Sequence, residues 1–157
     1  MKYRRLNIEE LSELETAFIR FLAVQGIPGD DWKKIKRDNP DRMNEMIELF
    51  SDTVFHETLT KINYLQFLQP REIKTFHCQP DKIKLLGLIV EGESNIDFTK
   101  MDSPQAMAQQ IATSKAQLKM YSAEKAYTKE RELELFGMME SGCLISEGEI
   151  YKLLKQL

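Results

Sequence analysis

The sequence has no apolar stretch long enough to cross a membrane. Its longest apolar run is Leu85–Val90, whereas a membrane-spanning helix needs about 20 residues. The first residues include three basic side chains, but acidic residues follow, and no apolar segment completes a secretory signal. We therefore expect a cytoplasmic protein that does not contact a membrane.

Cysteine and histidine are scarce, with only Cys78, Cys143, His56 and His77. Two cysteines allow at most one disulfide, and in a reducing compartment we expect both to be small buried residues. Structural zinc needs four ligands at short paired spacings, and the sequence has neither a Cys-x-x-Cys nor a His-x-x-x-His pair. Glycine-rich phosphate loops and dinucleotide fingerprints are also absent. The sequence thus predicts no metal and no cofactor.

An excess of one charge sign is also missing. The 157 residues include 22 basic and 25 acidic side chains, a net charge of −3, and the balance is similar in residues 1–70, 71–101 and 102–157. Because affinity for nucleic acid depends on basic side chains that neutralise phosphates, nucleic acid is not expected as the main partner. The length and the 42% of hydrophobic residues indicate a folded chain with one main core.

Helical periodicity organises the first part of the chain. Asn7 and Glu10 have the spacing of a capping box ahead of a helix that we expect to end at Gly26. Pro40 then opens the longest apolar stripe, which predicts a helix of about 28 residues that ends near Leu68.

The middle of the chain changes to the period of a β-strand. Arg71–Cys78 alternates between two faces, and Ile83–Val90 is rich in branched residues, so the two segments predict an antiparallel hairpin. A third strand has one nearby candidate, Asn95–Phe98. The polar stretch that follows the hairpin predicts a boundary between residues 1–101 and 102–157.

The last third is expected to be helical. Ser103-Pro104 starts a helix whose narrow apolar stripe needs a partner helix. A second helix runs from about Thr128 to Glu140 and ends at Gly142, and a capping box that begins at Ser146 starts a third. The acidic residues of the second helix are interpreted as a solvated face: Glu130, Glu132, Glu134 and Glu140.

These elements predict an α+β fold that is mostly helical. N-terminal helices would pack on a small antiparallel β-hairpin, with room for a third strand. A C-terminal helical arm, ending in a helical hairpin, would follow this core.

Two resemblances accompany this interpretation. The segment 135–157 resembles the short C-terminal helical-hairpin domain at the ends of many bacterial proteins, through Gly142, Leu144, Ser146, Glu149, Ile150 and Leu157. That resemblance implies assembly or partner contact. The start of the chain, Asp31-Trp32, Phe50-Ser51-Asp52 and residues 76–82 resemble a family of small uncharacterised bacterial proteins. This second resemblance implies no particular activity.

The two functional hypotheses belong to different classes. The leading one is a non-enzymatic interaction or assembly protein, whose C-terminal helices bind a second copy or a protein partner by burying apolar side chains. Its expected anchors are Met107, Ile111, Leu118, Tyr121, Leu135, Met139, Leu153 and Leu157.

The alternative is a small enzyme or a metal-dependent site around His56, His77 and Cys78. A neighbouring imidazolium can activate a thiolate. However, adjacent strand residues point to opposite faces, so only His56 could serve Cys78.

Overall fold

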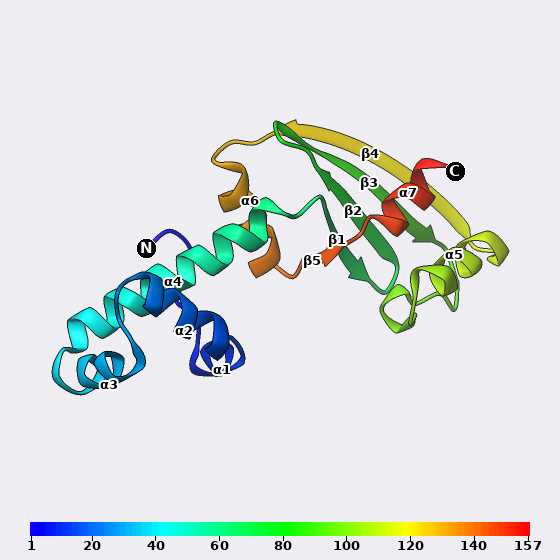
Figure 1. Cartoon of the computed structure of the whole chain (residues 1–157). Helices are drawn as coiled ribbons and strands as arrows, with labels where there is room; N and C mark the ends of the chain where they lie inside the picture. The colour runs from blue at the N-terminus through cyan, green and yellow to red at the C-terminus, as the bar shows by residue number, and fades with distance from the viewer. The chain divides into compact units, whose positions relative to one another are not determined.

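The computed structural model describes residues 1–157 and has an α+β fold, with seven α-helices and one five-stranded antiparallel sheet (Figure 1). The predicted fold class is confirmed, but the sheet is larger than the expected hairpin. The chain divides into two compact units, Met1–Thr60 and Lys61–Leu157. The predicted boundary between residues 101 and 102 falls inside the second unit. None of the helices combines the length and the hydrophobicity that a membrane span requires.

The unit Met1–Thr60 consists of four helices: α1 (Ile8–Glu13), α2 (Glu15–Val24), α3 (Gly29–Asp38) and α4 (Pro40–Thr60). The capping box of Asn7 and Glu10 is confirmed, although the expected first helix is interrupted at Leu14. Aromatic rings fill the interior, where the Phe18 ring meets the ring of Trp32 edge-on and also contacts the Phe50 ring. This unit therefore has a small core of its own.

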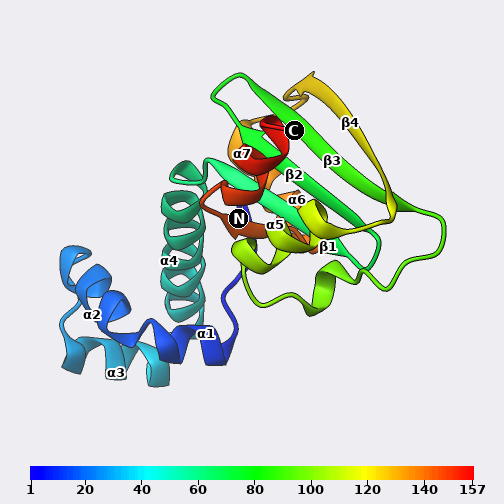
Figure 2. The same ribbon diagram turned by 90° about the vertical axis from the view of Figure 1, so that its right-hand side faces the viewer.

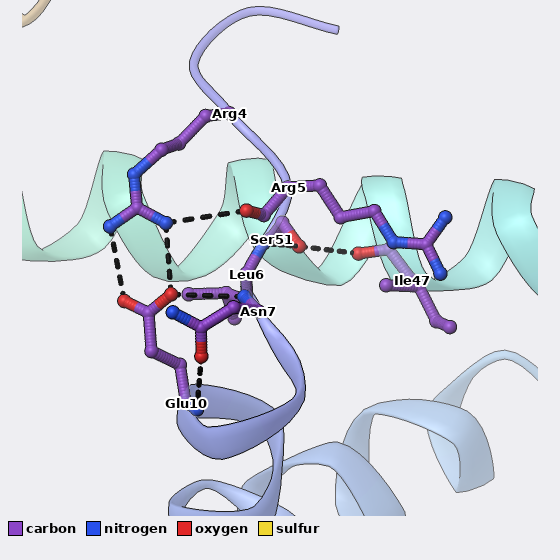
Figure 3. A network of polar contacts seen from close by, with 7 residues as sticks. All are labelled: Arg4, Arg5, Leu6, Asn7, Glu10, Ile47 and Ser51. Carbon is purple, nitrogen blue, oxygen red and sulfur yellow. Dashed lines mark hydrogen bonds and ion pairs between the residues drawn. The ribbon is translucent and has the colours of Figure 1, made fainter.

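The first residues of the chain are held against α4 and α1 by polar contacts (Figure 3). The Leu6 amide donates to the buried Ser51 Oγ at 2.9 Å, and that hydroxyl donates to the carbonyl of Ile47 at 2.7 Å. Arg4 forms two hydrogen bonds to the carboxylate of Glu10. These bonds order the chain terminus inside its own unit.

The unit Lys61–Leu157 is built on the sheet, whose strand order is β4-β3-β2-β1-β5. The strands are β1 (Tyr64–Gln69), β2 (Glu72–Cys78), β3 (Lys82–Glu91), β4 (Gln117–Ala126) and β5 (Leu144–Ser146). The predicted hairpin is confirmed as β2 and β3. Figure 2 shows β4 alongside β3 at one margin of the sheet.

Helices pack on both faces of this sheet. On one face, α5 (Pro104–Thr113), α7 (Glu149–Lys155) and the 3-10 turn Phe98–Lys100 cover the main core (Figure 2). That core is formed by Ile73, Leu88, Val90, Ile96, Phe98, Met107, Ile111, Ile150 and Leu154. On the other face, α6 (Arg131–Glu140) lies over side chains of β1, β2 and β3.

The helix predicted to extend to Leu68 ends at Thr60 instead, and β1 begins at Tyr64. All six residues of β1 pair with β2. Leu65 and Leu68 match helical spacing in the sequence, but in a strand residues three apart lie on opposite faces. The prediction joined the apolar residues of a helix end and of a strand into one stripe.

The helix predicted from Pro104 is also shorter than expected, which removes the continuous helical arm. Ser103 caps α5, as predicted, but Ser114 takes an extended conformation and ends the helix. Residues 117–126 then pair with β3 at every position. Gln, Leu, Lys, Met, Ala and Glu favour helices, so the pairing with β3 overrides the local preference.

The expected helical hairpin at the C-terminus contains a short strand. This strand, β5, lies between α6 and α7 in the chain and pairs with β1. The capping box predicted at Ser146 does not form, because the cap of α7 is Gly148 with a φ of 87°. The Ser146 hydroxyl accepts a hydrogen bond from the Gly148 amide instead. The expected third strand at Asn95–Phe98 is a loop that leads into a 3-10 turn.

Candidate functional site

A cavity of about 520 Å³ lies between α6 and the sheet. Its volume is in the range of small-molecule sites in proteins, about 300–1,000 Å³. One wall is formed by strands, and the opposite wall by α6 with the turns before and after it. The residues that line it are Phe67, Lys74, Phe76, Ile83, Lys125, Thr128, Lys129, Glu134, Gly137, Met138, Ser141 and Cys143.

The lining combines apolar side chains with positive charge. Three lysines and one glutamate give the lining a net formal charge of +2. The Lys125 ammonium is 3.6 Å from the Glu134 carboxylate, and the Lys74 ammonium is 4.0 Å from the carboxylate of Glu72. Lys129 forms no ion pair, so one cation of the lining is available to an anion.

Glu134 is buried, so the solvated face that the sequence predicts for it is wrong. Its carboxylate accepts hydrogen bonds from the Thr128 hydroxyl at 2.6 Å, from the Thr128 amide and from the Lys129 amide at 3.2 Å. The hydrogen bond from the Thr128 hydroxyl has the largest effect on the pKa of Glu134 and lowers it. Burial has the next largest effect and raises this pKa. Glu134 therefore stays ionised and holds the turn between β4 and α6 in place.

Arg131 fastens the start of α6 to the sheet. Its guanidinium donates to the carbonyls of Ile62, Cys78 and Gln79. The Tyr127 hydroxyl donates to the same Gln79 carbonyl at 2.7 Å. These bonds fix α6 over one end of the sheet.

The two cysteines differ in exposure, and both are free thiols. Cys78 is buried on the α6 face of β2, and burial raises its pKa to about 12. Cys143 is half-buried in the wall of the cavity. Burial raises the pKa of Cys143, while the charge of Lys74 acts in the opposite direction. Neither thiol is activated as a nucleophile at neutral pH.

His77 lies on the opposite face of β2 from Cys78. Its ring stacks on Tyr64 with centroids 4.6 Å apart and also contacts Tyr151 of α7. Burial lowers the pKa of His77, and the charges of Lys155 and nearby lysines act in the same direction. The lowered pKa favours the neutral form of the His77 ring within this aromatic cluster.

His56 belongs to the other unit, where its Nδ1 is 3.0 Å from the Tyr3 hydroxyl. No cluster of three or more His, Cys, Asp or Glu side chains is arranged to hold a metal ion. The hypothesis of a site around His56, His77 and Cys78 gains no supporting geometry from these placements.

The expected interaction anchors lie in several environments. Met107, Ile111 and Leu135 are buried within the unit, whereas Leu157 is exposed. Met139 and Leu153 are half-buried, as are Leu118 and Tyr121 of β4. The Tyr121 ring lies directly over Gly87 of β3, where an added Cβ would be only 2.1 Å from the ring.

β4 presents a long edge to solvent. It has ten residues, and β3 is its only neighbour in the sheet. Eight of its side chains are exposed, including Met120, and no proline or bulge interrupts it. Its backbone N–H and C=O groups on the outer side can pair with another strand.

No local pattern in the sequence indicates the cavity. Its lysines come from β2, β4 and the turn before α6, so no local motif unites them. One available signal was Gly137, a glycine in the interior of a helix-forming segment.

The comparisons with known proteins agree with the expected resemblance to a family without an assigned activity. No curated protein and no solved structure matches the chain. A family model matches residues 1–157, which include both compact units. The chain therefore belongs to this family, described as a family of unknown function (DUF6495).

Proposed function

We propose that this protein is a non-enzymatic assembly protein that pairs with a second copy of itself through the outer edge of β4. The supporting observation is the edge itself, ten residues long and uninterrupted, with β3 as its only neighbour. Unprotected edges of this length are templates for strand addition, in which backbone hydrogen bonds supply affinity. This proposal keeps the interaction role expected from the sequence, but it assigns the contact to β4 and not to the C-terminal helices.

The apolar helix residues favour this change of surface. Met107 and Ile111 belong to the main core, and Leu135 of α6 is completely buried. Their exposure to a partner would require part of the unit to unfold. β4 instead reaches a partner without loss of any existing backbone pair.

The sequence of β4 is compatible with pairing to itself. In an antiparallel pair of copies, residues on the same sheet face lie opposite each other. A register centred on Met120 places this exposed side chain against its own counterpart and Lys119 opposite Tyr121. A register centred on Ser122 would place Lys119 opposite Lys125, and like charges in direct opposition destabilise a sheet. We therefore choose the register centred on Met120.

The mass of the full chain in solution tests this proposal. We expect light scattering to give twice the chain mass of 18.3 kDa for the wild type. Met120→Lys should give the single-chain mass, because two ammonium groups would meet at the symmetry axis. Ile19→Lys is the matched control, since Ile19 is an exposed apolar residue outside the sheet, and it should leave the dimer intact.

A crosslink tests the register. In a Cys143→Ser background, Met120→Cys should form an intermolecular disulfide, because directly opposed Cβ atoms lie about 4.5–5.5 Å apart. Ala126→Cys, at the end of β4, should not crosslink in this register. A monomeric wild type at every concentration, or a dimer that survives Met120→Lys, would refute the proposal.

The proposal places the protein in the cytoplasm, where the two free cysteines would remain reduced.

A further inference from the structure

Assembly through β4 does not explain the cavity between α6 and the sheet. We infer that it binds a small organic anion, in which an apolar body carries one acidic group. The apolar body would lie against Phe67, Phe76 and Ile83, and the acidic group would face the Lys129 ammonium. None of the lining residues belongs to the segment 117–123, which pairs with a second copy in the register centred on Met120.

Gly137 is the first argument, because nothing in its surroundings requires a glycine. It lies in the interior of α6, and its φ is not positive. A Cβ built on Gly137 would meet no atom within 4 Å. Glycine is among the least favourable residues in a helix interior. Gly137 lines the cavity, so its missing side chain leaves the space between α6 and the sheet open.

The apolar wall is the second argument. Phe67, Phe76 and Ile83 come from three adjacent strands, and Met138 of α6 faces the same cavity. The rings of Phe67 and Phe76 provide flat aromatic surface, and neither ring is fully buried. An apolar wall that remains accessible next to a cavity of about 520 Å³ is typical of a small-molecule site.

The charge of the mouth is the third argument, and it selects an anion. Glu134 is the only acidic residue of the lining, and its carboxylate is already engaged by Thr128 and by the Lys129 amide. The Lys129 side chain has no acidic partner, whereas the Lys125 ammonium is 3.6 Å from the Glu134 carboxylate. An incoming carboxylate or sulfonate would therefore meet the unpaired ammonium group of Lys129 and no free acid.

Binding of anilinonaphthalene sulfonate to the full chain tests the inference, because this probe joins an aromatic body to one acidic group. We expect a saturable rise in its fluorescence. Lys129→Glu should weaken binding about tenfold. Gly137→Leu should abolish binding, because the new side chain would occupy the cavity and leucine favours helices. Lys155→Glu makes the same charge change on α7, on the opposite face of the sheet, and should leave binding unchanged.

Two further measurements separate this site from nonspecific dye binding. Decanoate should displace the dye, and decanol, which lacks the charge, should not. Bound dye should also slow alkylation of Cys143, which lines the cavity, whereas the buried Cys78 stays unreactive with and without dye. Equal dye binding by the wild type, Lys129→Glu and Gly137→Leu would overturn the inference. A monomeric wild type would refute only the assembly proposal.

Discussion

Replacing Gly137 by alanine should stabilise the protein. Gly137 is the seventh of the ten residues of α6 and lies inside both helix ends. The added Cβ would meet no atom within 4 Å, so the substitution creates no clash and gains almost no packing. The expected effect is therefore the difference in helix propensity alone, about 0.8–1.0 kcal/mol of added unfolding free energy.

The same substitution at Gly148 provides a matched contrast in the same unit. Gly148 has a φ of 87°, and a Cβ there would be 2.7 Å from the ring of Tyr64. Alanine is strained in this conformation and would also displace the ring, so Gly148→Ala should lower the unfolding free energy by more than about 1 kcal/mol. The two variants change one methyl group each and should have opposite signs.

Urea unfolding followed by far-ultraviolet circular dichroism measures both variants. Trp32, the only tryptophan, lies in the other unit, so its fluorescence would not follow α6. Gly137→Ala should raise the midpoint without changing the slope. The melting temperature should rise by about 2–4 °C if the chain unfolds as a whole, and by about 4–8 °C if this unit unfolds alone. A lower midpoint for Gly137→Ala would show that the space beside Gly137 is filled, and would remove the main argument for the cavity.

Three other substitutions or titrations probe the same unit. Gly87→Ala should cost about 1–3 kcal/mol, because its Cβ would lie 2.1 Å from the Tyr121 ring, and the loss should shrink in a Tyr121→Ala background. Glu134→Gln should cost about 1–2 kcal/mol at neutral pH. Because its hydrogen bonds lower the pKa of Glu134, this contribution is present above the ordinary glutamate pKa and is lost as the pH falls through the lower folded pKa, so acid unfolding curves of wild type and variant should converge. Thiol titration of the native chain at about pH 8 should detect Cys143 alone, with Cys78 reacting only after unfolding, and two native reactive thiols would contradict its burial.

Elements with local signals could be predicted from the sequence. The capping residues Asn7 and Ser103 both accept the backbone bonds that their spacing indicates. The alternation in residues 71–78 identifies β2 because the pattern and the strand coincide. In each case the residues that set the structure lie within a few positions of the residues that carry the signal.

β4 could not be predicted in this way, because its conformation depends on β3. Leu118 and Tyr121 have helical spacing, but they lie three residues apart in a strand and so leave it on opposite faces. Leu118 packs against the main core, and Tyr121 fills the space above Gly87. A glycine in β3 and a tyrosine that lies 34 positions further on in the sequence explain each other only after they are paired.

Two glycines near the end of α6 differ in whether neighbouring residues explain them. Gly142 was predicted to end the helix, and it does so with a φ of 112° and with the amides of Gly142 and Cys143 bonded to the carbonyls of Met139 and Met138. That role depends on the backbone of neighbouring residues, so the sequence reveals it. The residues next to Gly137 give no such reason for a glycine. The reason appears only in the folded unit, where Gly137 lines a cavity together with side chains of β1, β2 and β3, which are distant in the sequence. A glycine that is unfavourable for its own helix and unconstrained by its contacts is best explained by what the missing side chain leaves room for.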